Sequence, residues 1–178
     1  MEIVTDIEAL HEKARFLSLE EILSDEMQKF AEELMQFSIK GKYGVGLSAI
    51  QVGKPIAITV ITSKPTPNRP DLKVFNKTCF NLKILEGFGE KKPMWEGCCS
   101  VRGDDGMPIY AKIPRYESVR VSYRDEKGVL RKEVVGGFIG EVMQHEADHN
   151  VGRLISDLVD RREFISCDEF HEIMKNRK

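Results

Sequence analysis

Apolar residues recur at helical spacing in the first quarter of the chain. A capping-box sequence, Ser18-Leu19-Glu20-Glu21, precedes this pattern, which continues as far as Gly41. The apolar positions are Met27, Phe30, Ala31, Leu34 and Phe37. They predict one N-terminal helix whose apolar stripe faces the core. Residues 161–178 predict a further helix near the C-terminus.

The middle of the chain carries strand patterns. Residues 56–61 form a short apolar run that predicts a buried strand, and residues 74–85 carry further strand signals. Polar and apolar residues alternate over 118–124, and the turn sequence Asp125-Glu126-Lys127-Gly128 leads into residues 129–135. This arrangement predicts a hairpin. The proline-rich run 64–70 predicts a surface loop.

Composition fits a globular domain. The 178 residues are 41% hydrophobic and 31% charged, and the formal net charge of −2 gives no signature of nucleic-acid binding. Four cysteines, two of them adjacent, make a poor disulfide framework, so Cys79 and Cys167 are interpreted as ordinary thiols in a reducing compartment. No apolar run suits a signal peptide or a membrane span. We therefore expect a cytoplasmic protein with no membrane partner, or one whose organelle address has been removed.

Residues 144–149, with the sequence Gln-His-Glu-Ala-Asp-His, combine metal-binding and proton-transfer groups. On a helix His145 and His149 share one face, and Glu146 follows the first of them closely enough to meet a metal-bound water. Preceding apolar residues direct these side chains into the core; they are Phe138, Ile139, Val142 and Met143. Buried histidines and a buried glutamate are costly without a metal. The segment therefore predicts a metal site with Glu146 as the base.

The third ligand distinguishes the classes of metallohydrolase. A metzincin peptidase would need a histidine where this chain has Ile155, although Glu163 or Glu169 could act as a downstream ligand. Upstream, residues 96–100 have the sequence Glu-Gly-Cys-Cys-Ser and offer thiols. One cysteine with two histidines leaves a fourth tetrahedral position open for water, as a catalytic site requires.

A glycine-rich segment, residues 44–51, has the sequence Gly-Val-Gly-Leu-Ser-Ala-Ile-Gln. It lacks the Gly-Lys-Ser/Thr of a phosphate loop. It is either a tight turn that enters a strand or a segment whose glycines let the backbone approach a ligand. In the second case Gln51 could donate a hydrogen bond to a developing oxyanion.

Together these strands and the motif helix predict an α+β fold. We expect β-strands wrapped around a central metal-binding helix, with an N-terminal helix and a C-terminal helix. The sequence contains no internal repeat or linker, so residues 1–178 are expected to form a single catalytic domain.

The three segments, in this order and spacing, resemble the signature motifs of the peptide deformylases, and the resemblance covers about residues 8–160. It implies removal of the formyl group from the N-terminal formyl-methionine of newly made polypeptides, with release of formate. The positions that match the family's metal ligands are Cys98, His145 and His149. Those that match its base and oxyanion donors are Glu146, Gln51 and the backbone N–H of Cys99.

These ligands suit zinc, iron, nickel or cobalt alike. The resemblance implies one divalent ion, Fe²⁺ in the cell, with Zn²⁺ or Ni²⁺ in purified protein. The implied partners are nascent polypeptides that bear formyl-methionine, so the chain is expected to work near the ribosome.

A substrate pocket is expected beside His145. Its apolar lining would suit the flexible thioether of methionine. The residues expected to bind substrate are Val45, Gly46, Glu96, Gly97, Phe138, Glu141 and Val142. Glu96 either orients the site from behind a ligand or is a solvated loop carboxylate.

Several residues depart from the usual family pattern. Cys99 stands where leucine is usual, and Ser48 where alanine is usual. Residues 101–113 are longer than is common and are expected to form a loop that covers the peptide. Glu141 replaces an apolar residue and is expected at the pocket rim, where it would narrow substrate choice.

Two other functions remain open at this point. One is a non-catalytic, metal-stabilised interaction module, which would have no use for Glu146 as a base. The other is a zinc peptidase that acts on unformylated peptides, disfavoured by Ile155 in place of the last histidine.

Overall fold

The computed structural model describes residues 1–41, 44–65 and 72–176. Its helices are α1 (Ile7–Leu10), α2 (Leu19–Leu23), α3 (Asp25–Gly41), α4 (Gly137–Asn150) and α5 (Cys167–Lys175), with 3-10 turns η1 (Ala49–Val52), η2 (Ile155–Asp157) and η3 (Arg161–Glu163). Its strands are β1 (Gly46–Ser48), β2 (Ile58–Ser63), β3 (Phe75–Arg102), β4 (Pro108–Arg124) and β5 (Leu130–Gly136). The strands form one antiparallel sheet in the order β1-β2-β3-β4-β5. A fold that mixes helices with a sheet was predicted and is confirmed.

The predicted N-terminal helix is two helices. The capping box is present, because Ser18 Oγ accepts from the N–H of Glu21 and the Glu21 carboxylate accepts from the N–H of Ser18. Ser24 then takes an extended conformation, with φ −69° and ψ 146°, and ends α2. Its hydroxyl accepts a hydrogen bond from the N–H of Met27 at 3.3 Å, so it caps the start of α3. Ser24 therefore divides the predicted helix into α2 and α3, although the helical spacing of apolar residues continues beyond it.

The long β3–β4 hairpin was not predicted from the sequence, and the expected loop over 101–113 is wrong. The two strands stay paired as far as Arg102 and Pro108, and the turn between them is closed by a hydrogen bond of 2.9 Å from Gly103 N to Met107 O. Pro93 and Pro114 stand opposite each other within the pairing. Because prolines argue against a paired strand, they concealed this part of the hairpin in the sequence.

The other strand predictions come closer. The run predicted over 56–61 is β2, shifted by two residues, and the hairpin predicted over 118–135 is confirmed as β4 and β5. The turn between them places Gly128 at φ +73°, where glycine carries no steric cost. Of the proline-rich run, Lys64 and Pro65 lie outside the helices and strands, and residues 66–70 fall outside the described residues.

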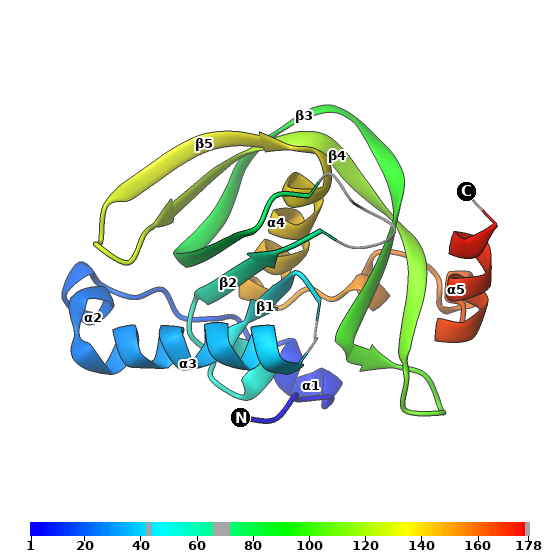
Figure 1. Cartoon of the computed structure of the whole chain (residues 1–178), viewed down its shortest axis with the longest axis horizontal. Helices are drawn as coiled ribbons and strands as arrows, with labels where there is room; N and C mark the ends of the chain where they lie inside the picture. Colours follow the sequence, from blue (N-terminus) through cyan, green and yellow to red (C-terminus); the bar gives the residue numbers. More distant parts are fainter. Residues whose placement is uncertain (42–43, 66–71, 177–178) are drawn as a thin grey trace.

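Helix α4 packs against β1, β3, β4 and β5, and Figure 1 shows it beneath the arch of these last three strands. Helix α3 covers β2 and β1. At the end of α4, Gly152 has φ +69° and donates its N–H to His149 O, as is typical of a glycine that follows the end of a helix. These contacts hold the motif helix against the sheet.

The C-terminal prediction holds in part. Residues 161–178 contain η3 and α5 instead of one continuous helix, and residues 177–178 are not described. Phe170 of α5 stacks on Tyr110 of β4, with ring centroids 4.0 Å apart. Among the helices of the described chain, none has the length and apolar character that crossing a membrane requires.

Candidate metal centre and catalytic cavity

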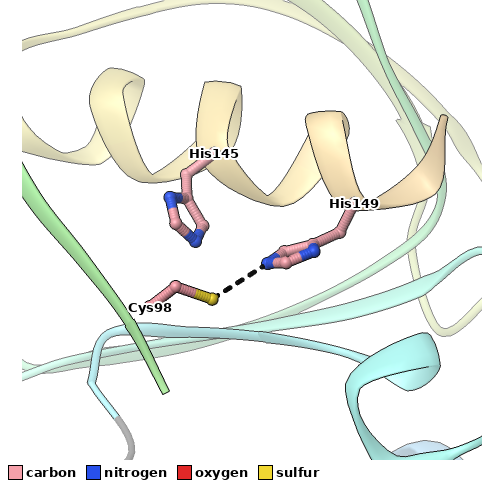
Figure 2. A group of neighbouring side chains, drawn as sticks. All are labelled: Cys98, His145 and His149. Carbon is pink, nitrogen blue, oxygen red and sulfur yellow. Dashed lines mark hydrogen bonds between the residues drawn. The ribbon is translucent and has the colours of Figure 1, made fainter. Parts of the chain in front are cut away.

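Three donor side chains converge from two elements. Cys98 comes from β3, and His145 and His149 lie one turn apart on α4 with their rings directed toward the thiol (Figure 2). Their donor atoms all lie within 4.8 Å of one another. The Cys98 Sγ to His149 Nε2 distance is 3.5 Å. In a tetrahedral zinc site a sulfur and a nitrogen ligand lie about 3.6 Å apart, so the three residues fit one metal ion.

The protonation of the donors depends on burial and on their neighbours. Burial lowers the pKa of His149 well below its ordinary value, which keeps the imidazole neutral as a metal ligand must be. A hydrogen bond with Cys99, together with burial, raises the pKa of the Cys98 thiol well above its ordinary value. A cation at this position would supply the stabilisation that the thiolate needs.

The carboxylate of Glu96 sets the orientation of His145. Oε2 lies 2.9 Å from His145 Nδ1, which leaves Nε2 for the metal position. Burial raises the pKa of Glu96, but the hydrogen bonds from His145 and Arg115 outweigh it, and the pKa is lowered overall. For His145, burial lowers the pKa, but the hydrogen bond with Glu96 outweighs burial and the pKa is raised overall. Glu96 is therefore not a solvated loop carboxylate.

Arg115 lies behind this pair and was not singled out from the sequence. It is 5% exposed, contacts Glu96 at 2.7 and 3.0 Å, and forms a second ion pair with Asp148 of α4. One guanidinium thus joins β3, β4 and α4, and each charge in the group has a partner of opposite sign. Arg115 precedes the alternating run of residues 118–124, and its local sequence carries no signal of this role.

Glu146 is 2% exposed and faces the end of β1. Its Oε2 accepts a hydrogen bond of 2.7 Å from Ser48 Oγ. A Cβ on Gly46 would lie 2.3 Å from Glu146 Oε1, so only glycine lets the carboxylate occupy this position. Burial raises the pKa of Glu146 above its ordinary value, as suits a group that both accepts and donates a proton near neutral pH.

The Gln51 side chain is fixed with its amide N–H₂ toward the thiols. Its Oε1 accepts a hydrogen bond of 2.9 Å from Ser48 N, which assigns the other amide atom as the donor. Nε2 lies 3.4 Å from Cys98 Sγ and 3.3 Å from Ser100 Oγ. The side chain is 2% exposed, so this donor is held in place before any substrate arrives.

A cavity of about 440 Å³ opens beside these groups. Every residue predicted to bind substrate lines it: Val45, Gly46, Glu96, Gly97, Phe138, Glu141 and Val142. The predicted catalytic residues Gln51, Cys99 and Glu146 line it too, and so do the predicted ligands Cys98 and His145. His149, the remaining predicted ligand, lies deeper and is 1% exposed. The end of the β3–β4 hairpin adds a further wall, formed by Trp95, Arg102, Met107, Pro108 and Tyr110. All but Trp95 lie in residues 101–113, which were expected to cover the peptide as a loop.

The downstream ligand candidates lie elsewhere. Glu163 accepts a hydrogen bond from Asp160 N at 3.0 Å, and Glu169 accepts one from Ser166 N at 2.8 Å, each at the start of a helical turn. The ligand cluster in the described chain uses Cys98 in their place. All four cysteines are free thiols.

The fold and the site together define a metal-dependent hydrolase. The chain matches the family model described as polypeptide deformylase over residues 1–164. It is 31% identical over 172 residues to peptide deformylase 2 of Nostoc sp., which covers 95% of this chain and 92% of that protein. It is 39% identical over 125 residues to the peptide deformylase of Flavobacterium johnsoniae, which covers 66% of this chain and 61% of that protein.

Solved structures give the same result. The Met-Ala-Ser-bound class I type b peptide deformylase from Acinetobacter baumannii has a TM-score of 0.77 and 27% identity, over 89% of this chain and 98% of that one. The peptide deformylase of Synechococcus elongatus in complex with actinonin has a TM-score of 0.75 and 28% identity, over 99% and 87%.

The chain belongs to the polypeptide deformylase family, as its three motifs predicted. It is a hydrolase that removes the N-formyl group from the formyl-methionine of newly made polypeptides. An interaction module and a peptidase for unformylated peptides are both set aside.

Proposed function

We propose that Cys98, His145 and His149 hold one divalent metal ion and that Glu146 is the base for deformylation. The observation that carries this proposal is the convergence of three donor atoms within 4.8 Å beside a buried carboxylate. A divalent ion bound there would supply Lewis-acid polarisation of water. Glu146 takes a proton from the attacking water as the water oxygen bonds to the formyl carbon. It donates that proton to the amine nitrogen as the C–N bond breaks, which yields formate and a free N-terminus.

The oxyanion of the tetrahedral intermediate is stabilised by two donors from this chain. Gln51 Nε2 is fixed by the contact of its Oε1 with Ser48 N, and the backbone N–H of Cys99 is the second donor. A backbone donor does not depend on the side chain, so a cysteine in place of leucine is compatible with the reaction.

The methionine side chain occupies the apolar part of the cavity, against Val45, Gly46, Phe138 and Val142, and Glu96 and Gly97 also line the cavity. The tripeptide in the Acinetobacter baumannii structure begins with methionine, which supports a pocket for this side chain.

We also propose that Glu141, which lines the cavity, sits at the rim of the methionine pocket and narrows substrate choice. The ratio of kcat/KM for formyl-Met and formyl-Leu peptides is the test. It changes in Glu141→Ile if the carboxylate borders the pocket and stays equal if it does not.

The family and the chemistry of the three donors support a proposal for the metal ion, the substrate and the compartment. We propose Fe²⁺ as the ion in the cell, with Zn²⁺ or Ni²⁺ in purified samples, because soft thiolate and imidazole donors accept all three. The substrates are nascent formylated chains, met near the ribosome in the cytoplasm, where free thiols persist. Residues 1–178 act as one catalytic domain whose strands wrap around α4 as its central helix.

Formate release from a formyl-Met peptide by iron-loaded protein under argon tests the function. The wild type is expected to turn over, and Glu146→Gln is expected to keep its metal while kcat falls about 10²–10⁴-fold. An active Glu146→Gln variant would show that another group is the base. Loss of metal from this variant would show that Glu146 contributes to the metal site.

A further inference from the structure

Ser48 contacts the carboxylate of Glu146, the proposed base. It is fully buried at the end of β1, and its Oγ lies 2.7 Å from Glu146 Oε2 and 3.4 Å from the backbone oxygen of Glu146. An alanine at this position would have no atom to make either contact. The hydroxyl therefore gives this chain a fixed link between β1 and the base on α4.

A second hydroxyl supports the first. Thr59 stands opposite Ser48 in the pairing of β1 with β2, and its Oγ1 lies 3.0 Å from Ser48 Oγ. An ionised carboxylate only accepts hydrogen bonds, so the single proton of Ser48 goes to Glu146. Thr59 must then be the donor to Ser48. The hydroxyl of Thr59 thus donates to Ser48, and the hydroxyl of Ser48 donates to Glu146 Oε2. In such a chain each hydrogen bond strengthens the other.

The two oxygens of Glu146 consequently have different surroundings. Oε2 is held by Ser48, whereas Oε1 lies against the backbone of Gly46, a residue that lines the cavity with Glu146. Within the described part of the chain no donor contacts Oε1. The hydrogen bond on one side and the contact with Gly46 on the other fix the rotation of the carboxylate plane.

We propose that Ser48 is a positioning residue for deformylation, which holds Oε2 of Glu146 so that Oε1 carries the proton between water and the leaving amine. This inference rests on the proposed role of Glu146 as the base. The carboxylate does not have to rotate during the reaction, because one oxygen is anchored throughout and the side chain lines the cavity. Ser48 acts on the chemical step and not on peptide binding.

Removal of the hydroxyl is the test. In Ser48→Ala, kcat for a formyl-Met peptide is expected to fall about ten-fold, the loss that corresponds to one hydrogen bond to a charged group. KM and metal content are expected to stay at the wild-type values. The backbone N–H of Ser48 still bonds to Gln51 in this variant, so the oxyanion donor is not disturbed. An unchanged kcat, or a change confined to KM, would overturn the proposal.

Two further variants separate positioning from simple loss of stability. Ser48→Ala/Thr59→Val removes both hydroxyls, so that no orphaned donor remains, and it is expected to show the same loss of kcat. Ser63→Ala removes a buried hydroxyl, 3% exposed, that has no partner among the described residues, and it is expected to behave as wild type. A wild-type kcat in the double variant would show that the Ser48→Ala loss came from the orphaned Thr59.

Measurements in the Glu146→Gln background distinguish failure of this inference from failure of the proposed function. There Ser48→Ala is expected to leave the residual rate unchanged, because no carboxylate remains to be positioned. A further ten-fold loss would overturn the inference and leave the base assigned. High activity of Glu146→Gln itself would overturn the proposed function. Infrared difference spectra against Glu146→Gln isolate the stretching bands of this carboxylate, and Ser48→Ala is expected to shift them.

Discussion

Glu96 Oε2 and His145 Nδ1 lie 2.9 Å apart, and both side chains are largely buried. The contact selects the imidazole tautomer whose Nε2 faces the metal position, and it makes that nitrogen a better ligand. Glu96→Gln is therefore expected to weaken metal affinity about 10–100-fold. Competition with a chelator measures this affinity. Glu86→Gln, a half-exposed glutamate on the same strand, is the matched control and should bind metal as wild type does. Equal affinity in the two variants would show that Glu96 does not support the ligand.

The adjacent thiols are expected to differ in metal binding. Cys98→Ser should lose the ion or bind it much more weakly, because a serine hydroxyl is a poor substitute for a thiolate ligand. Cys99→Leu should retain it, because Cys99 lies outside the cluster of donors that converge in the described chain. Metal analysis of the two purified variants decides between them. The reverse result would move the ligand to Cys99.

Gln51→Ala is expected to lower kcat on the order of 10²–10³, the usual loss for one oxyanion donor. The amide is preorganised by Ser48 N, so its contribution belongs to the transition state, and KM should change little. Gln36→Ala removes an exposed amide on α3 that bonds to Glu32 at 2.9 Å and does not line the cavity, and it serves as the control. Equal rates for Gln51→Ala and wild type would reduce residues 44–51 to a structural turn.

Glu133 makes stability depend on pH at a place remote from the metal centre. Burial raises its pKa, but the hydrogen bonds from Lys77 and Tyr123, at 2.7 and 2.8 Å, outweigh this effect and lower it below the ordinary 4.5. A lowered folded-state pKa means that the stabilisation is complete above the unfolded value and is lost as pH falls through the folded value.

Glu133→Gln should accordingly have a lower free energy of unfolding than wild type at neutral pH, and the difference should shrink below pH 4.5. Urea unfolding across this range measures it. Glu2→Gln, at an exposed position near the start of the chain, is the control. A difference that grows on acidification would contradict the assigned direction of the shift.

The convergence of His145 and His149 was predictable because its geometry is local. His145 and His149 share a helix face whatever the rest of the fold does, and the short run 96–100 supplied the remaining donor by its chemistry. The hairpin over 118–135 was predictable for the same reason, since alternation and a turn sequence define it within eighteen residues.

The contacts that the sequence did not predict join segments that lie far apart along the chain. Ser48 meets Glu146 across 98 residues, and Arg115 meets Glu96 and Asp148 across 19 and 33. No window of sequence contains both partners. The outer β3–β4 hairpin was missed because two prolines stand within it, and with it the aromatic wall of Trp95 and Tyr110 was missed.

The three donors lie far apart in the sequence: Cys98 is in β3, whereas His145 and His149 are in α4, which follows β4 and β5. Cys98 precedes His149 by 51 residues, with all of β4 and β5 between them. During synthesis Cys98 is therefore made well before either histidine. The three donors can converge only after β4, β5 and α4 have been made and have folded against β3. Until then the chain can offer an ion at most one of the three donors. Metal loading thus depends on folding that is almost finished, and each new enzyme molecule becomes active only after its own later residues have been made.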